Sequence, residues 1–284
     1  MARGRVYVSH KPFNRRQGTQ RSAAPVNRNR QRALDRRTMK NLQHALKTAL
    51  YVLIGLVVLA GCGSTPRPAR ISVLTYNIYH GEDAQGGSNL DAVARIINRL
   101  KPDVVALQEV DNKTERAKGL DLTFELSRRT GMEGVFGQAM PYSGGGYGEA
   151  VLTRLPILAA RNHPLPYVGE AEPRAALEIT VPLANGEHLL FVGTHLDHQE
   201  DPENRLMQAR RLMELYADST GPIILAGDLN ATPESEPMAL LLVQWAYAGQ
   251  MAPEPTFPAV EPTRKIDYIL YRPKDRWRVV ETRV

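Results

Sequence analysis

The residues best suited to chemistry stand at the ends of short apolar runs. In the clearest case, residues 223–226 (Ile-Ile-Leu-Ala) lead to Gly227 and then to Asp228 and Asn230. An acid and an amide two residues apart at the end of a buried strand share one face of that strand. Such a pair is suited to binding a cation or a phosphate.

Four further apolar runs end in the same way, at Asn77, Glu109, His195 and the segment that contains Asp267. Carboxylate oxygens, amides and imidazoles are the groups that hold a divalent cation and a phosphate. One polar residue after a strand is ordinarily a turn residue. Five strand ends with one kind of chemistry instead favour a shared site.

In their order along the chain, these segments resemble the endonuclease/exonuclease/phosphatase superfamily, the DNase I-like group. The resemblance covers residue 71 to the end and rests on Asn77, Gln108–Glu109, Thr194–Asp197, Gly227–Asn230 and Ile266–Tyr268. It implies an α+β fold, a four-layer α/β/β/α sandwich of two mixed sheets with the site at the strand ends. It identifies a class of phosphoester hydrolases and no single substrate.

The resemblance also implies a role for each residue. Glu109 is the expected ligand of Mg²⁺ or Mn²⁺, and Asn77 supports the metal and contacts the phosphate. Asp228 orients or deprotonates the attacking water. Asn230 donates hydrogen bonds to the transition state, and His195 contacts a phosphate oxygen.

Two further residues are expected to bind substrate. Arg174 stands where relatives often carry an arginine facing the cleft, and a guanidinium matches phosphate geometry. A surface ion pair is its alternative. Glu149 is expected to pair with His195, although many relatives have Asn or a small residue there. The remaining histidines are expected to lie in loops or on the surface: His80, His163 and His198.

Asp267 matches a family residue that orients a catalytic histidine in a Ser-Asp-His motif one strand later. This sequence has no histidine after His198 and reaches Val284 just after a predicted strand. Losing a positioned acid or base costs about 10²–10⁴-fold in rate. We therefore expect either a domain truncated before its last strand, which exposes a sheet edge, or a weakened or inactive relative that binds phosphorylated ligands.

Helical periodicity marks two strand-helix-strand units. Asn89 can cap a helix whose apolar positions run from Leu90 to Leu100, and Pro102 follows it. Apolar positions from Leu206 to Tyr216 repeat the spacing before the run that leads to Asp228. The two halves of the catalytic body are thus expected to share a plan.

The charge is unevenly distributed along the 284 residues. Residues 1–61 hold 13 Lys and Arg against one Asp, which leaves 23 basic against 29 acidic residues in 62–284. The body therefore lacks the basic surface expected for tight binding of duplex DNA. A small or lipid-derived phosphoester is the favoured substrate, with nucleic acid as the alternative.

The N-terminal region resembles that of a bacterial lipoprotein. Residues 39–61 combine a basic start with an uncharged core at 49–60, and Leu59–Cys62 resembles a lipobox whose cysteine is lipidated after cleavage. Cys62 is the only cysteine in the chain. An ordinary membrane anchor is the alternative. We accordingly expect a protein held by lipid at the bacterial cell envelope, at the outer membrane or facing the periplasm.

The other boundaries follow from composition. Residues 1–38 are expected to be a disordered basic leader, with Met39 as the start of translation. A basic arm that binds nucleic acid or anionic lipid is the alternative. Residues 62–70 are a predicted tether, and 71–284 are the catalytic domain. A monomer is expected, with its phosphoester substrate and the membrane, but no protein, as partners.

Overall fold

The computed structural model describes residues 4–10, 69–249 and 254–284, which belong to one compact unit. The predicted signal peptide, Cys62 and most of the tether lie outside the described residues. No helix in the described ranges is long and apolar enough to cross a membrane.

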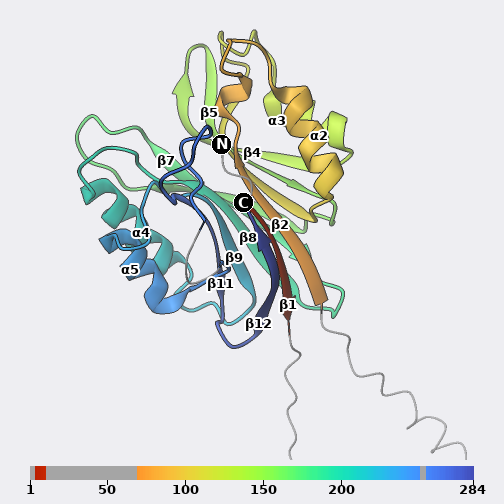
Figure 1. The fold of residues 1–284 in the computed structure, drawn as a ribbon, viewed down its shortest axis with the longest axis vertical. Coiled ribbons are helices and arrows are strands. Elements are labelled where there is room, and N and C mark those ends of the chain that lie inside the picture. The colour runs from red at the N-terminus through yellow and green to blue at the C-terminus, as the bar shows by residue number, and fades with distance from the viewer. Residues whose placement is uncertain (1–3, 11–68, 250–253) are drawn as a thin grey trace, which may run out of the picture. The chain divides into compact units, whose positions relative to one another are not determined.

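Two six-stranded mixed sheets form the unit (Figure 1). The first sheet has the order β12 (Trp277–Arg283), β1 (Gly4–His10), β2 (Ala69–Asn77), β3 (Val104–Asn112), β5 (Gly145–Thr153) and β4 (Glu133–Tyr142). The second has the order β10 (Ala246–Tyr247), β11 (Asp267–Arg272), β9 (Ile223–Asp228), β8 (His188–His195), β7 (Arg174–Pro182) and β6 (Ala159–Leu165).

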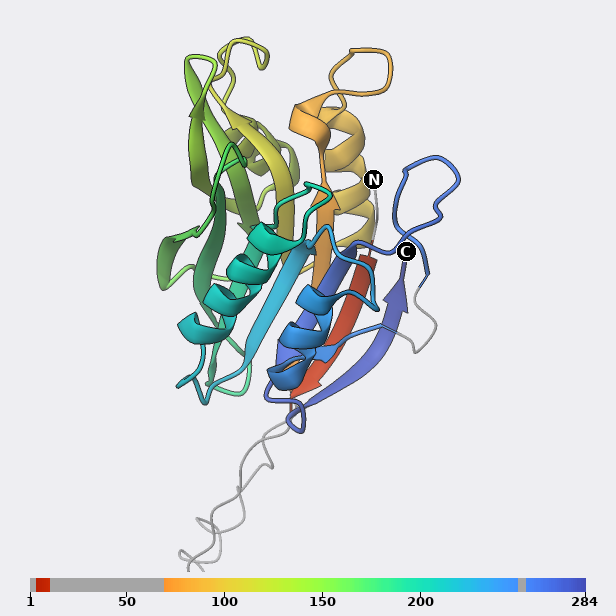
Figure 2. The ribbon, with the colours of Figure 1, turned by 90° about the vertical axis from the view of Figure 1, so that its left-hand side faces the viewer.

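Helices cover the outer face of each sheet. The 3-10 helix η1 (Tyr79–Gly81) and helices α2 (Leu90–Leu100) and α3 (Leu122–Thr130) accompany the first sheet. Helices α4 (Glu203–Leu215) and α5 (Glu236–Gln244) cover the second, as Figure 2 shows. The predicted four-layer DNase I-like sandwich is confirmed.

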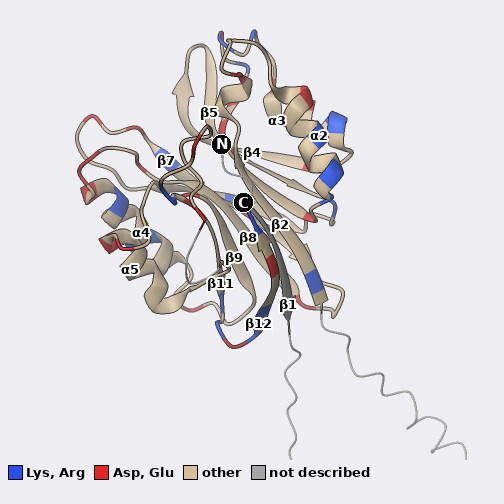
Figure 3. Cartoon of the chain, viewed as in Figure 1, with Lys and Arg blue, Asp and Glu red and all other residues tan. Residues whose placement is uncertain are grey.

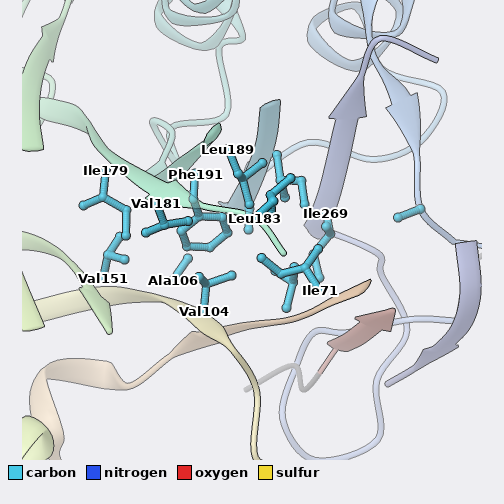
Figure 4. Packing of buried hydrophobic residues seen from close by; sticks show 14 of the residues in the cluster. Ile71, Val104, Ala106, Val151, Ile179, Val181, Leu183, Leu189, Phe191 and Ile269 are labelled. Carbon is cyan, nitrogen blue, oxygen red and sulfur yellow. The ribbon is translucent and has the colours of Figure 1, made fainter. Parts of the chain in front are cut away.

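Three hydrophobic clusters hold the four layers together. One lies between the sheets, where Val104 and Val151 of the first face Ile179 and Phe191 of the second (Figure 4). A second joins the first sheet to α2 and α3, and a third joins the second sheet to α4 and α5. The strands that lead to the candidate site residues are therefore packed on both faces, which explains their uninterrupted apolar sequences.

Each sheet contains one parallel strand pair joined by a helix. Strands β2 and β3 are parallel and connected through α2, and β8 and β9 are parallel and connected through α4. Parallel neighbours end at the same edge of a sheet, so each pair delivers two strand ends to one place. The expectation of two similar halves is met.

The leader departs from its expected structure. Residues 4–10, placed by composition in a disordered segment, form β1, which pairs with β2 and β12. The arginine content of residues 1–38 hides a short run, Val6–Val8, whose residue types favour strands. The folded unit therefore begins before residue 71, and the sheet position beside β2 is filled.

Candidate active site

Five strand segments bring the candidate residues to one place between the two sheets. Asn77 ends β2, and its Nδ2 donates to Oε1 of Glu109 at 2.7 Å and to Oδ2 of Asp228 at 3.4 Å. His195 is the register partner of Asp228, and Asp267 is its partner on the other side. One amide thus joins a carboxylate of each sheet.

Glu109 lies at an irregularity in β3, where the pairing with β5 shifts register between Leu107 and Val110. Its φ of 57° is in the left-handed region, which costs energy for a residue with a side chain. The bulge turns Glu109 out of the strand alternation and toward Asn77. Its side chain is 20% exposed, so the carboxylate is accessible from solvent.

His80, expected in a surface loop, lies beside Glu109. Its Nδ1 is 3.9 Å from Oε2 of Glu109, and its Nε2 contacts Oε2 of Glu82 at 3.0 Å. The positive φ of His80, 43°, places the ring there, and its side chain is only 12% exposed. Position in the sequence could not show this, because the contact depends on the turn that η1 makes.

A close approach of two strands fixes Asp228. A Cβ at Gly227 would lie 1.9 Å from the carbonyl oxygen of Thr194, so only glycine allows β8 and β9 to pair here. After the strand, the backbone N–H of Asn230 donates to Oδ1 of Asp228 at 3.0 Å, and Asn230 has a φ of 46°. The left-handed turn brings the amide back toward the acid.

Burial and neighbouring carboxylates oppose ionisation of Asp228. Desolvation, followed by the charge of Asp267, raises the pKa of Asp228 to about 8, while the Asn230 N–H partly offsets this. Desolvation also raises the pKa of Asp267, and a hydrogen bond from Thr256 and the charge of Lys265 oppose that rise. The pair holds negative charge poorly unless a cation is near.

Arg174 holds His195 in one orientation. Nη1 of Arg174 is 2.9 Å from Nδ1 of His195, and its Nη2 is 3.1 Å from Nδ1 of His198. Its Nη1 also pairs with Glu172 at 3.2 Å. Arg174 is only 3% exposed, and its two terminal nitrogens contact protein groups, whereas its Nε has no hydrogen-bond partner among the described residues. Its binding of a phosphate stays a prediction.

Donors face both ring nitrogens of His195. The Arg174 guanidinium is 2.9 Å from Nδ1 and Nδ2 of Asn230 is 3.0 Å from Nε2, whereas a neutral imidazole has only one accepting nitrogen. Desolvation, then the charges of Arg174 and His198, keeps the pKa of His195 well below its usual value. His195 is accordingly neutral near pH 7.

Asn230 and His195 meet beside Asp228 at the end of β8. Nε2 of His195 is 3.0 Å from Nδ2 of Asn230 and 3.8 Å from Oδ2 of Asp228. Nδ2 of Asn230 also donates to the carbonyl of Leu196 at 3.0 Å. An amide and an imidazole therefore stand next to the desolvated Asp228 carboxylate.

Arg174 contacts the His195 ring, and no hydrogen bond of Glu149 to that ring is found among the described residues. The Glu149 side chain is 1% exposed, and its Oε2 has no hydrogen-bond partner among the described residues. Desolvation raises its pKa well above the usual value, with Arg174 opposing and Glu109 adding to the rise. The adjacent Tyr147 also has a raised pKa, through burial and the charge of Glu109.

A small cavity of about 30 Å³ lies beside Asp267. Its wall combines Thr75 of β2, Lys265 and Asp267 next to β11, and Thr282 of β12. Lys265 is 8% exposed, and desolvation lowers its pKa to about 8. Lys265 was not among the residues predicted for the site. It lies two residues before Asp267 on the same face of an extended segment, and this spacing could have indicated its place beside Asp267.

The donor set is compatible with a divalent cation. Glu109 offers carboxylate oxygens at an accessible position, and Asp228 contacts the same Asn77 amide. The oxygen of Asn77 accepts from the Tyr79 N–H at 3.0 Å, so its Nδ2 faces the carboxylates. The excess of carboxylates also fits a bound cation, since desolvation and then the charges of neighbouring carboxylates raise the pKa of both Asp228 and Glu149. Within the described ranges, no three acidic, His or Cys side chains are already arranged around one point.

Comparisons with solved structures agree with this architecture. A functionally unknown protein of Enterococcus faecalis V583 is 21% identical, with a TM-score of 0.58 over 70% of this chain and 86% of that one. A mannosyl-6-phosphatase of Bacteroides thetaiotaomicron is 17% identical, with a TM-score of 0.57 over 71% and 85%. The human Nocturnin catalytic domain with a bound sulfate anion is 21% identical, with a TM-score of 0.55 over 70% and 80%.

These likenesses establish the fold, and the sequence establishes the family. Residues 74–283 match the sequence model of the Endonuclease/Exonuclease/phosphatase family. The match spans both sheets and every strand end described above except that of β1. The chain therefore belongs to the endonuclease/exonuclease/phosphatase family.

Proposed function

We propose that the protein is a divalent-metal-dependent phosphoester hydrolase. The observation that carries the proposal is the Asn77 amide, which contacts Glu109 of one sheet and Asp228 of the other at 2.7 and 3.4 Å. A metal ligand and a base that lie this close can serve one phosphoryl group. Family membership supports the reaction class.

Glu109, assisted by Asn77, would hold Mg²⁺ or Mn²⁺. The bound ion supplies neutralisation of the phosphate charge that otherwise repels an attacking oxygen. Asp228 orients a water and accepts its proton, which its raised pKa favours. Asn230 donates to the phosphoryl oxygens and His195 contacts them, and the charge of Asp267 helps to raise the pKa of the neighbouring Asp228.

The favoured substrate is a small or lipid-derived phosphoester. In the described part of the chain, Lys and Arg are spread over α2, α4, β12 and loops, with acidic residues among them on both sides of the molecule (Figure 3). Tight binding of duplex DNA relies on a basic patch or stripe that spans several phosphates. The mannosyl-6-phosphatase with this fold acts on a phosphorylated sugar, as its name states, and this supports a small substrate.

The reaction class is tested by assaying the full chain on an aryl phosphodiester with Mg²⁺ or Mn²⁺. We expect activity that EDTA abolishes and that Glu109→Gln reduces by at least about 10²-fold, because the loss of metal charge removes several kcal/mol of transition-state stabilisation. Glu133→Gln, an exposed acid on β4, is the matched control. Activity that survives both EDTA and Glu109→Gln would reject the mechanism.

Substrate class is tested by competition. Short DNA duplexes, phospholipid head-group diesters and sugar phosphates are each added to the aryl phosphodiester assay. We expect the small phosphoesters to inhibit at lower phosphate concentration than DNA does. The reverse order would assign the protein to the nucleases.

The second candidate, expected from the sequence as the alternative, is a binding protein for phosphorylated ligands. Such a protein would bind a phosphate ester in the presence of Mg²⁺ without turning it over. Isothermal titration alongside the activity assay separates the two. The lipid anchor at Cys62 and the cell-envelope location remain predictions from the sequence.

A further inference from the structure

Strand β1 occupies an internal position in the first sheet, between β2 and β12 (Figure 1). It is antiparallel to both neighbours, from Gly4 opposite Thr75 to His10 opposite Ala69 on one side. In the described part of the chain, β1 is the only strand that connects β12 to the rest of the sheet. Both neighbouring backbones therefore depend on it.

The connection that leads to β1 is unlike any other in the unit. Residues 11–68 separate it from β2, and β12 lies at the other end of the sequence. Apart from β12, every other strand of this sheet pairs with at least one neighbour that is joined to it by a hairpin or by a helix. A strand without a short connection on either side is held mainly by its ladder hydrogen bonds.

The predicted cleavage site lies within this connection. Processing ahead of Cys62 would cut the chain between β1 and β2 and separate β1 from the catalytic body. An unpaired row of N–H and C=O groups would then face solvent on both β2 and β12. A chain that starts at Cys62 would therefore lack β1 and could not form the complete first sheet.

Loss of β1 would affect the active site through both of its neighbours, β2 and β12. Strand β2 ends at Asn77, the amide that joins Glu109 and Asp228. Strand β12 brings Thr282, the register partner of Val6, to the cavity beside Asp267. The strand β1 therefore supports two walls of the site without contributing a side chain to the mechanism.

We propose that β2 and β12 form a strand-acceptor site, that Gly4–His10 of the same chain is the strand it holds, and that the folded protein retains the residues ahead of Cys62. The occupant binds through its backbone in antiparallel orientation. Residues 4–10 are then part of the domain, in place of the disordered leader that the composition predicts.

The strand is tested first by proline substitution in the full chain. In a strand paired on both sides, alternate residues bond to alternate neighbours, so Val6→Pro and Tyr7→Pro each remove a bond to a different neighbour. We expect both to lower the thermal midpoint by roughly 5–10 °C. Amide exchange should accelerate in β2 for one variant and in β12 for the other. Val6→Thr, which keeps the N–H, is the control.

The acceptor site is tested by cutting the connection. A site-specific protease sequence inserted between residues 30 and 31 allows cleavage of the folded full chain. We expect the N-terminal fragment to co-elute with the body in native chromatography and to exchange with an added labelled peptide of residues 2–12. A fragment that elutes alone while amides of β2 and β12 stay protected would overturn the proposal.

Two further results would also overturn it. One is an intact mass showing that protein from the native host starts at Cys62 while β12 remains protected from exchange. The other is a dimer that forms through β1, shown by a dimeric wild-type chain and monomeric proline variants, since the strand would then come from a second copy. These readouts do not depend on catalysis, so they remain informative if the protein proves not to be a hydrolase.

Discussion

The two sheets of the molecule share a plan but are completed differently. Each has a parallel pair crossed by a helix and an antiparallel hairpin on one side. In the second sheet, β11 arrives next to β9 within the same half of the chain and brings Asp267 to Asp228. In the first, the position beside β2 is taken by β1, from the far N-terminus. One half carries its own completing strand and the other depends on a distant one.

The way in which each sheet is completed is a separate matter from the site residues that it supplies. In the proposed mechanism, the second sheet contributes the base Asp228 with Asn230 and His195 beside it, whereas the first contributes Glu109 and Asn77. Neither set acts alone, because the Asn77 amide links them. Substitutions in matching places of the two sheets can therefore distinguish catalytic from structural roles.

The largest expected effect is on the second sheet's base. Asp228→Asn keeps the size of the side chain and removes its capacity to accept a proton, so we expect the rate to fall by about 10²–10⁴-fold. Initial rates on an aryl phosphodiester at saturating Mg²⁺ measure it. Asp218→Asn, an exposed acid after α4, should leave the rate unchanged. A loss below tenfold would mean that another group activates the water.

The next effect compares the two cores. Leu74 of β2 and Leu225 of β9 are both fully buried under their helices, in the first and second sheet respectively. Leu74→Ala and Leu225→Ala should each cost about 2–5 kcal/mol in unfolding free energy, since each leaves a cavity. Urea denaturation of both variants measures it. If only Leu74→Ala is tolerated, the first sheet is not fully folded without further support.

A smaller effect is expected at the link between the sheets. Asn77→Ala removes the amide that contacts both carboxylates, and we expect Mg²⁺ affinity to fall by about 10–100-fold, as for residues that orient a metal ligand. Titration calorimetry measures it in the full chain. Asn98→Ala, which loses one exposed hydrogen bond to Arg129, is the control. Equal Mg²⁺ affinity in both variants would place the cation elsewhere.

The smallest effect is a pH dependence of stability in metal-free protein. The pKa of Asp228 is about 8 in the folded state and about 3.9 when unfolded, so the folded state binds more protons between these values. Stability from this group is full below about pH 4 and is lost as pH rises to about 8. Between about pH 6.5 and 8, His195 and Lys265 contribute little to the pH dependence of stability. Their lowered pKa values make protonation differ between the folded and unfolded states below this range for His195 and above it for Lys265.

Thermal midpoints across that window test this dependence. We expect the wild-type midpoint to decline with pH, because each carboxyl group with a raised pKa costs up to about 1.4 kcal/mol of stability per pH unit. Asp228→Asn should reduce the decline and leave the part that Glu149 contributes through its own raised pKa. Added Mg²⁺ should reduce it too, because a cation favours the ionised carboxylates. A midpoint that rises with pH in EDTA would show that Asp228 is ionised without a metal.

The candidate site could be predicted largely from local signals. Apolar runs that stop at polar residues marked the strand ends of β2, β3, β8 and β9, and parallel pairing then dictates that their ends meet. The four-layer sandwich followed from the resemblance that these residues carry. Both kinds of inference use positions only a few residues apart, where sequence is most informative.

Contacts that depend on register or on turns could not be predicted in this way. The contact of Arg174 with His195 requires β7 to start opposite the end of β8, which no single segment specifies. The approach of His80 to Glu109 depends on left-handed backbone at both residues. The strand at Gly4–His10 was hidden because composition was averaged over a long basic region.

The guanidinium that caps His195 also limits which bonds the enzyme can break with ease. An imidazole whose Nδ1 faces Arg174 cannot become a cation at neutral pH, so it cannot hand a proton to a departing alkoxide. Esters whose alcohol is weakly acidic should react slowly, and aryl esters, which leave as stable phenolates, should react fast. A plot of log rate against the pKa of the leaving alcohol would then be steep. Arg174→Gln, which removes the guanidinium beside Nδ1 of His195, should make the slope smaller.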